Sequence, residues 1–315
     1  MALMRTIMAV DIGGTQLRAA AFKQDQIQPL TQKRVETKAD EPNTFGRLVK
    51  LIEDIWPQNE EITAIGVSSP GPLDPHTGII MNPPNIKEWR DFPITAKLTE
   101  HFGIPSYLDN DANLAGLAEW KFGAGRGHHN VLYLTVSTGV GGGVIIDDRL
   151  LQGYHGLAAE LGHTTVQADG PLCGCGQKGH LESYSSGTGI ERFVAEQLKA
   201  GRESILNPDK KNSAHTISEA AKKGDALSIE AYQIAGKYLG IGVANFLHAF
   251  DPSVVIFGGG VSQSGPLLFE SFHLSLKERV IHPRYLEGLA ITRAELGDDS
   301  GLLGARALAE LKLIV

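Results

Sequence analysis

Two glycine turns in the sequence carry residue types that bind phosphate. The first glycine turn is Asp11-Ile-Gly-Gly-Thr15 and the second is Ser137-Thr-Gly-Val-Gly141. Glycine at a turn lets backbone N–H groups approach an anion, threonine adds a hydroxyl donor, and Asp11 can orient a hydrated magnesium ion. Either turn alone is equally well a plain hairpin. Both together favour a site that cradles one triphosphate, formed by Asp11, Gly13, Gly14, Thr15, Thr138 and Gly139.

The spacing of these turns excludes two common nucleotide motifs. No Gly-Lys-Ser/Thr follows either turn, as a Walker motif requires, and neither turn opens a helix inside a βαβ unit, as a dinucleotide fingerprint does. A third run, Gly258, Gly259 and Gly260, ends an expected strand and could admit an adenine ring against bare backbone. A plain strand-to-helix turn explains this run equally well.

A polar run, Asp-Asn-Asp-Ala-Asn at 109–113, lies where an expected strand ends and a helix begins. Polar side chains at the carboxyl end of a strand are often catalytic. A carboxylate there could act as general base toward an alcohol while a neighbouring amide holds a sugar hydroxyl. Helix capping by Asn110 or Asp111 is the alternative. A calcium loop is excluded because Leu114 and Trp120 stand where that loop needs Gly and Glu.

Four soft or borderline metal ligands fall within 18 residues: His163, Cys173, Cys175 and His180. Glycines between them allow the chain to wrap around an ion, and a His2Cys2 set fits tetrahedral zinc. The alternative is two buried cysteines beside ordinary histidines. A closed set of four ligands leaves no position for water, so we expect a structural zinc ion that shapes the loop.

In their order along the chain, these motifs resemble the ROK family of sugar kinases and sugar-responsive repressors. The resemblance spans nearly the whole chain and extends to Ser69-Pro-Gly-Pro72 and Glu160-Leu-Gly-His163. It implies an α/β, two-lobed, actin-like and hexokinase-like (ribonuclease H-like) ATPase fold. We expect residues 1–121 plus 301–315 to form the smaller lobe, and residues 122–300 to form the larger lobe with the zinc loop.

The resemblance also implies roles for individual residues. Asp111 would be the catalytic base, and Asn110 would contact the sugar. Other sugar-binding residues would be Gly71, Glu160, His163 and Glu182. His163 would also ligate zinc, together with Cys173, Cys175 and His180; His180 stands where the family usually has a third cysteine.

The implied reaction is ATP- and Mg2+-dependent phosphorylation of the 6-hydroxyl of a hexose. Residues 68–85 are most similar to the family's bacterial glucokinases, which predicts glucose as substrate and glucose 6-phosphate as product. N-acetylmannosamine, N-acetylglucosamine and fructose kinases of the family are the alternatives, and a non-catalytic sugar sensor is the alternative from another class. The repressor branch is disfavoured because the first glycine turn begins at Asp11, which leaves no room for an N-terminal winged helix.

The composition limits which binding partners and which cellular location are expected for this protein. The 315 residues are 42% apolar with 37 glycines, enough for two globular domains. A formal charge of −7 with no cluster of basic residues argues against nucleic acid as a partner. No apolar run approaches the ~20 residues that span a bilayer. The two cysteines are too close for an unstrained disulfide. We therefore expect a cytoplasmic enzyme, and the resemblance implies a homodimer or a tetramer.

The elements that must position these residues follow from apolar patterning. We expect strands at 6–12, 17–22, 62–67, 106–108, 131–136, 144–146 and 253–257, and helices at 93–102, 112–122, 190–200, 217–223, 226–250, 267–280 and 301–313. A strand, glycine turn, strand pattern occurs at 6–22 and again at 131–146. This repetition indicates two lobes of related design.

Overall fold

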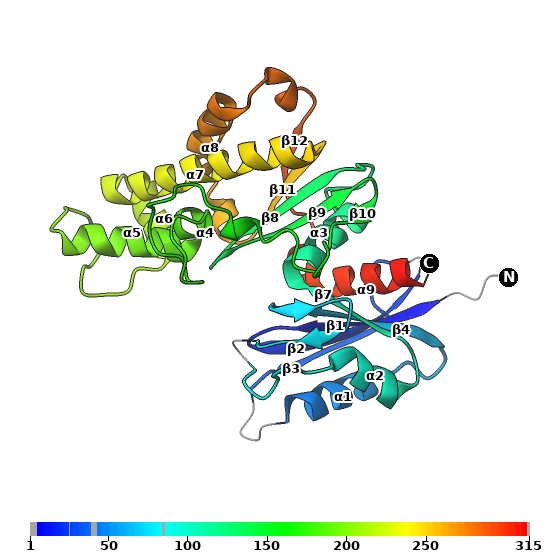
Figure 1. Cartoon of the computed structure of the whole chain (residues 1–315). Helices are drawn as coiled ribbons and strands as arrows, with labels where there is room; N and C mark the ends of the chain where they lie inside the picture. Colours follow the sequence, from blue (N-terminus) through cyan, green and yellow to red (C-terminus); the bar gives the residue numbers. More distant parts are fainter. Residues whose placement is uncertain (1–4, 25, 39–42, 84–85, 314–315) are drawn as a thin grey trace. The chain divides into compact units, whose positions relative to one another are not determined.

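A computed structural model describes residues 5–24, 26–38, 43–83 and 86–313. The chain groups into two compact units (Figure 1). Unit 1 runs to His128 and adds Gly143–Ala159 and the chain from Ala294; unit 2 comprises His129–Gly142 and Glu160–Arg293. The lobes expected from the sequence assign residues 143–159 to the larger lobe, whereas the structure groups them with unit 1. The lobe boundaries stay a prediction. Within the described part of the chain, no helix combines the length and apolar character needed to cross a bilayer.

Unit 1 is built on a five-stranded sheet in the order β3-β2-β1-β4-β7. Its strands are β1 (Thr6–Ile12), β2 (Gln16–Lys23), β3 (Thr31–Glu36), β4 (Ile62–Ser69) and β7 (Ser106–Asn110). The first three strands pair antiparallel, whereas β4 lies parallel to both β1 and β7. A small hairpin of β5 (Leu73–Asp74) and β6 (Ile79–Ile80) lies beyond β4.

Helices cover both faces of this sheet (Figure 1). They are α1 (Thr44–Asp54), α2 (Ile94–Phe102), α3 (Asp111–Phe122) and α9 (Ser300–Lys312), with a short 3-10 turn at Gly297–Asp299. Alternate residues of β1 point to opposite faces, because a strand has a period of two. Met8 therefore packs in the cluster that includes Leu48 of α1, and Ala9 packs with Leu114 of α3 and Leu302 of α9.

Helix α9 lies unusually close to its neighbours because glycine occupies the contact points. A Cβ atom on Gly66 of β4 would lie 1.8 Å from the carbonyl oxygen of Ala305. A Cβ atom on Gly304 would lie 2.1 Å from the carbonyl oxygen of Leu114 in α3. Part of the glycine excess in the sequence therefore serves backbone packing in unit 1.

The second sheet has the order β10-β9-β8-β11-β12. Its strands are β8 (Val131–Val136), β9 (Val140–Ile146), β10 (Arg149–Leu150), β11 (Val254–Gly258) and β12 (Ala290–Arg293). The helices of unit 2 are α4 (Glu182–Ser185), α5 (Gly187–Lys199), α6 (Ala214–Lys222), α7 (Ala226–Phe250) and α8 (Pro266–Arg279), with 3-10 turns at Leu161–His163, Val261–Ser264 and Pro283–Leu286.

The repeated hairpin is confirmed by the topology of the two sheets. In each sheet a glycine turn joins two neighbouring strands, β1 to β2 and β8 to β9, and two parallel strands follow on the other side. The sequence patterns missed β3, α1 and β12, and also the short elements α4, β5, β6 and β10. Strands β3 and β12 are sheet edges with largely exposed side chains, so they lack the apolar run that marks a buried strand.

Candidate functional site

The β7–α3 junction places Asn110 and Asp111 at the carboxyl end of a parallel strand. The Asn110 side chain accepts a hydrogen bond from the backbone N–H of Ala112 at 2.9 Å and caps α3, as the capping alternative expected. Asp111 begins the helix. Gly71 also lies here, because a Cβ atom built on it would lie 3.3 Å from Asn110 Nδ2. Three of the expected sugar-site residues are thus neighbours in unit 1.

A buried carboxylate that the sequence reading did not single out supports this junction. Asp109 is completely buried and accepts hydrogen bonds from Asn110 N at 2.7 Å, Asn113 Nδ2 at 3.0 Å and Gln152 Nε2 at 2.5 Å. Burial raises the pKa of Asp109, while these hydrogen bonds oppose the rise. Asp109 therefore ties the segment after β10 to the turn that carries Asn110 and Asp111.

The first glycine turn brings Asp11 against a basic side chain. Both Nε and Nη2 of Arg18 donate to Asp11 Oδ2, at 2.9 and 2.6 Å. The turn itself is closed by Gly13 N, which donates to Gln16 O at 2.9 Å. A Cβ atom on Gly301 at the start of α9 would lie 2.7 Å from Asp11 Oδ1. The Asp11 carboxylate therefore lies beside a helix N-terminus, where backbone N–H groups favour negative charge.

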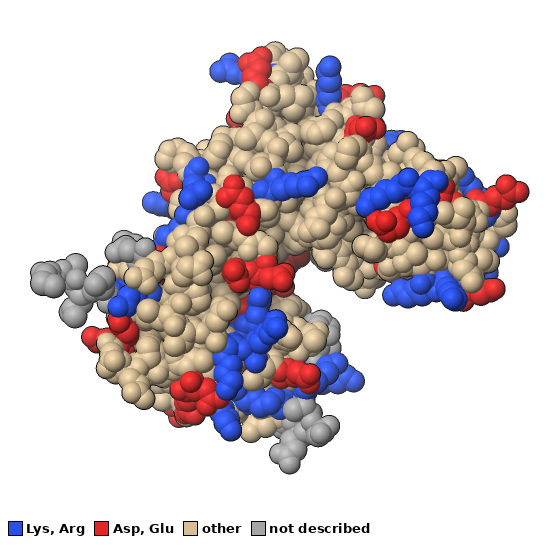
Figure 2. Space-filling model, turned by 180° about the vertical axis from the view of Figure 1, so that it is seen from behind, with Lys and Arg blue, Asp and Glu red and all other residues tan. Residues whose placement is uncertain are grey.

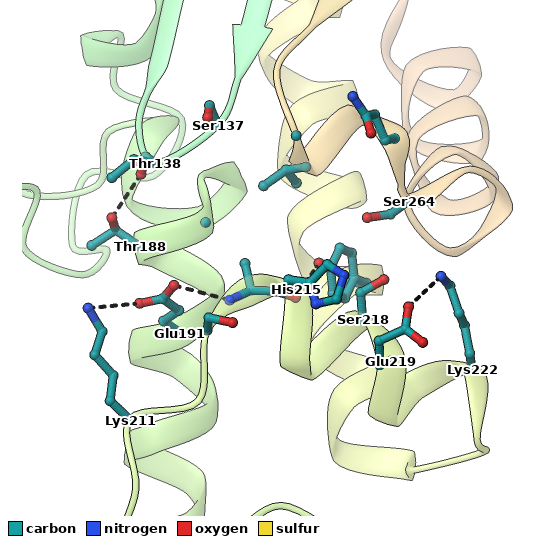
Figure 3. Close-up of a pocket in the computed structure, with 17 residues that line it drawn as sticks. Ser137, Thr138, Thr188, Glu191, Lys211, His215, Ser218, Glu219, Lys222 and Ser264 are labelled. Carbon is teal, nitrogen blue, oxygen red and sulfur yellow. Dashed lines mark hydrogen bonds and ion pairs between the residues drawn. The ribbon is translucent and has the colours of Figure 1, made fainter. Parts of the chain in front are cut away.

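The second glycine turn borders a cavity of about 580 Å3 in unit 2. Figure 3 shows Ser137 and Thr138 at one end of this cavity and residues of α5 and α6 along its sides. Thr188 Oγ1 donates to Thr138 O at 2.8 Å. Gly260 also lines the cavity, so the structure brings together two of the expected nucleotide-binding glycine segments. A cavity of this volume falls within the range of small-molecule sites.

Charged side chains of the cavity come in opposite pairs that the sequence reading missed. Glu191 lies 3.5 Å from Lys211, and Glu219 lies 2.7 Å from Lys222 (Figure 3). His215 of α6 lies between them along the wall. His215, Glu219 and Lys222 all lie on α6, whereas Glu191 comes from α5 and Lys211 from the loop before α6. A similar mixture of charges appears on the face in Figure 2, where basic and acidic side chains are interspersed.

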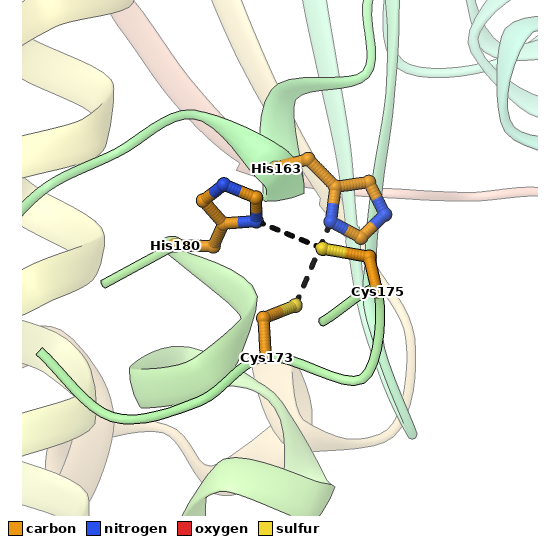
Figure 4. Close-up of side chains that lie close together, drawn as sticks. All are labelled: His163, Cys173, Cys175 and His180. Atoms are coloured by element: carbon orange, nitrogen blue, oxygen red, sulfur yellow. Dashed lines mark hydrogen bonds between the residues drawn. The ribbon is translucent and has the colours of Figure 1, made fainter. Parts of the chain in front are cut away.

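The four expected metal ligands come together in the metal loop, which comprises residues 163–180 (Figure 4). Their ligand atoms all lie within 4.8 Å of one another. Cys173 Sγ lies 3.6 Å from His163 Nδ1, and Cys175 Sγ lies 3.2 Å from His180 Nδ1. Tetrahedral zinc with its usual bond lengths places its ligand atoms roughly 3.3–3.8 Å apart. The donor set and its spacing therefore fit zinc.

Glu182 lies between the metal loop and the second glycine turn. Its Oε1 accepts a hydrogen bond from Cys173 Sγ at 3.3 Å, and its Oε2 accepts one from Val140 N at 3.0 Å. The pKa of the Cys173 thiol is raised to about 12, mainly because the thiol is buried. In the metal-free loop the thiol is therefore protonated at neutral pH and donates its hydrogen to Glu182. Glu160 directly precedes the 3-10 turn that carries His163.

The candidate residues divide between the two units. Unit 1 carries Asp11, Gly13, Gly14, Thr15, Gly71, Asn110 and Asp111, and unit 2 carries Thr138, Gly139, Glu160, His163, Cys173, Cys175, His180, Glu182 and Gly258 to Gly260. Within unit 2, the cavity and the metal loop flank the same glycine turn. Residues 84–85, which end the glucokinase-like stretch of the sequence, lie outside the described residues.

The model of the ROK family matches residues 7–312. The chain belongs to the ROK family. A glucokinase of Thermotoga maritima is 33% identical to this ROK protein over 98% of each chain. Among solved structures, a ROK hexokinase from Thermus thermophilus has a TM-score of 0.84 and 37% identity, covering 98% of this chain and 99% of its own. A ROK glucokinase from Streptomyces griseus, solved with glucose and AMPPNP, has a TM-score of 0.77 and 32% identity and covers 97% and 99%.

These similarities confirm the actin-like, hexokinase-like ATPase fold that the sequence predicted for this ROK protein. They span both units, so the fold of each unit belongs to the family.

Proposed function

We propose that this ROK protein is an ATP-dependent glucokinase that transfers the γ-phosphoryl group of ATP to the 6-hydroxyl of glucose. The observation that carries the proposal is the β7–α3 junction, where Asp111, Asn110 and Gly71 lie together at the carboxyl end of a parallel strand. The ROK glucokinases and hexokinase to which the chain is similar over nearly its whole length support this assignment.

In this mechanism Asp111 acts as the general base. Its carboxylate takes the proton of the 6-hydroxyl as that oxygen attacks the γ-phosphorus, and glucose 6-phosphate and ADP are the products. Asn110, Gly71, Glu160, His163 and Glu182 would hold the sugar. Phosphoryl transfer depends mainly on positioning and charge stabilisation. Asp109 serves positioning, because it fixes the backbone of the turn that carries Asp111.

The two glycine turns and the cavity would hold the nucleotide. The backbone of the turns at Gly13, Gly14 and Gly139, with the hydroxyls of Thr15 and Thr138, provides donors for phosphate oxygens. The cavity at Thr138 and Gly260 has room for the base and ribose. Asp11 would orient a bound Mg2+ ion, which would supply charge neutralisation to the phosphates of ATP.

The metal loop would hold a structural zinc ion through His163, Cys173, Cys175 and His180. With the ion bound, these four residues would hold the loop rigid, and His163 would keep a fixed position in the proposed sugar site. We further propose a cytoplasmic location and a homodimer or tetramer. Plasma mass spectrometry of the purified protein tests the zinc content, and light scattering tests the oligomeric state.

One assay tests the assignment and its alternatives. ADP release is measured with ATP and Mg2+ in the presence of glucose, mannose, fructose, N-acetylglucosamine or N-acetylmannosamine. We expect the highest kcat/KM with glucose. A higher kcat/KM with an N-acetylated hexosamine or fructose would identify that sugar, and not glucose, as the preferred substrate. Sugar binding without ADP release from any sugar would support the non-catalytic sensor and refute the kinase.

A further inference from the structure

Thr37, the residue after β3, contacts the backbone of the first glycine turn at two points. Its hydroxyl donates to Gly13 O at 2.7 Å, and its backbone N–H donates to Thr15 O at 2.8 Å. Only 1% of the surface of Thr37 is exposed. Two carbonyl groups of the turn are thus held by one buried residue that lies 24 positions from Gly13 in the chain.

These two bonds determine the direction in which peptide groups of the turn face. The peptide bonds of the turn are trans, and in a trans peptide the C=O group and the following N–H group point in opposite directions. Since Gly13 O points toward the Thr37 hydroxyl, the N–H of Gly14 points away from Thr37. Since Thr15 O points toward Thr37 N, the N–H of Gln16 also points away from Thr37. The turn therefore directs two N–H donors away from the residue that holds it.

Helix α1 fixes Thr37 from the other side. Arg47 Nη2 donates to Thr37 O and also to Thr44 Oγ1, the latter at 3.1 Å. Thr44 is buried at the start of α1, and its N–H donates to Glu88 Oε1 at 2.5 Å. All of these groups belong to unit 1. Thr37 therefore has a fixed position that depends on protein contacts and not on a ligand.

The two adjacent glycines give the turn a need for such support. Glycine reaches a wider range of φ and ψ than other residues, so the peptide group between Gly13 and Gly14 can rotate at little steric cost. In the rotated orientation the Gly13 carbonyl oxygen would face the side toward which the Gly14 N–H now points. A carbonyl oxygen repels a phosphate oxygen, whereas an N–H group attracts it. The Thr37 hydroxyl stabilises the orientation that attracts phosphate.

We propose that Thr37 is a positioning residue for the nucleotide, because its hydroxyl holds the Gly13–Gly14 peptide group in the orientation that donates to a phosphate oxygen. This inference rests on the proposed function, in which the first glycine turn holds phosphate. Thr37 acts through the turn and does not itself touch the nucleotide. Its loss should therefore weaken nucleotide binding and leave the affinity for glucose unchanged.

Thr37→Val tests the hydroxyl, because valine keeps the shape of threonine and removes the donor. The dissociation constant of AMPPNP with Mg2+ is measured by calorimetry in the absence of sugar. We expect about 5-fold weaker binding, because one hydrogen bond between uncharged groups shifts an equilibrium about 2- to 10-fold. The KM for glucose, measured by ADP release at saturating ATP, should change by less than about 2-fold, below the effect of one such bond.

Two variants separate positioning from a general loss of stability. Thr37→Ser keeps the hydroxyl and should bind AMPPNP as the wild type does. Thr31→Val is the matched control at the first residue of β3, where Thr31 Oγ1 donates to Ile55 O at 2.8 Å. This control removes the same kind of bond from the same strand, but the bond does not hold the glycine turn. It can lower the free energy of unfolding in urea and should leave the AMPPNP affinity unchanged.

Two results would overturn the inference: an AMPPNP affinity of Thr37→Val within about 2-fold of wild type, or an equal loss of affinity in Thr37→Val and Thr31→Val. If Thr37→Val does not fold, Thr37→Ala and Thr37→Ser are compared instead, since these two differ only by the hydroxyl. Equal AMPPNP affinity of these two variants would overturn the inference as well. Sugar-dependent ADP release by the wild type keeps the proposed function intact in either case. Absence of that release with every sugar tested refutes the proposed function itself.

Discussion

Replacement of the buried Glu119 should destabilise unit 1 specifically. Glu119 is completely buried at the end of α3. Its Oε1 accepts hydrogen bonds from Glu295 N at 2.9 Å and Leu296 N at 2.8 Å, and its Oε2 accepts one from Ala124 N at 2.9 Å. One carboxylate thus joins the segments after α3 and before α9, close to two points where the chain passes from one unit to the other.

The magnitude follows from the donors left without an acceptor. In Glu119→Gln the amide oxygen can still accept the hydrogen bonds made at one of the two carboxylate oxygens. The NH2 group takes the place of the other oxygen and faces a backbone N–H donor there. A lost charge-assisted hydrogen bond or an unsatisfied buried donor costs about 1–3 kcal/mol. The donors are only partly buried, so water can reach some of them. We expect a loss of about 1–2 kcal/mol in Glu119→Gln and about 2–4 kcal/mol in Glu119→Ala, since the latter removes all three bonds.

The assay uses the distribution of tryptophan. All three tryptophans, Trp56, Trp89 and Trp120, belong to unit 1, so their fluorescence during urea unfolding reports on that unit. The control is Glu53→Gln, where an exposed glutamate pairs with His101; exposed pairs contribute at most about 1 kcal/mol. If Glu119→Gln and the control shift the urea midpoint equally, the reasoning about the buried carboxylate is wrong.

Four further predictions concern the site and its support. Asp111→Asn should lower kcat at least 100-fold, the lower end of the contribution of a general base, with glucose binding largely intact, and near-normal kcat would contradict its role. Zinc removal should lower the Tm and raise the KM for glucose together; an unchanged KM in verified metal-free protein would count against the metal loop as a support of the sugar site. Gly66→Ala should lower the free energy of unfolding in urea by about 1–3 kcal/mol, because the new Cβ would overlap the Ala305 carbonyl. Gly103→Ala is the comparison: its Cβ would meet no neighbouring atom, so this variant tests backbone strain alone. The pKa of Asp109 is raised, so the folded state keeps the proton of this carboxyl group to higher pH than the unfolded state does. The free energy of unfolding of the wild type, relative to that of Asp109→Asn, should therefore fall as pH rises from about 4 through the raised pKa. A difference between the two proteins that does not change with pH would refute this.

Local patterns predicted the elements that carry the site. The glycine turns at the β1–β2 and β8–β9 hairpins, the long helix α7 and the four metal ligands were all visible as short-range spacing. The metal ligands were predictable because they lie within 18 residues, so chain geometry alone keeps them close. Edge strands such as β3 gave weaker signals, since their side chains face water.

Contacts between distant residues were not predictable in this way. Glu119 meets Leu296 across 177 positions, Asp109 meets Gln152 across 43, and Val140 meets Glu182 across 42. In the sequence Glu119 and Asp109 look like ordinary polar residues, and Glu182 was expected only to bind the sugar. The role of each carboxylate depends on which backbone N–H groups the packed sheets and helices bring to it.

The sequence by itself determined the family and the fold class and singled out the candidate catalytic and metal-ligating residues, because these depend on residue types at short spacing. The tertiary structure decided what surrounds those residues: Arg18 on Asp11, a cavity of paired charges beside Thr138, and Glu182 between the metal loop and the glycine turn. The physical reason is burial. A carboxylate taken out of water must find donors in the protein, and only the packed chain determines which donors are within reach.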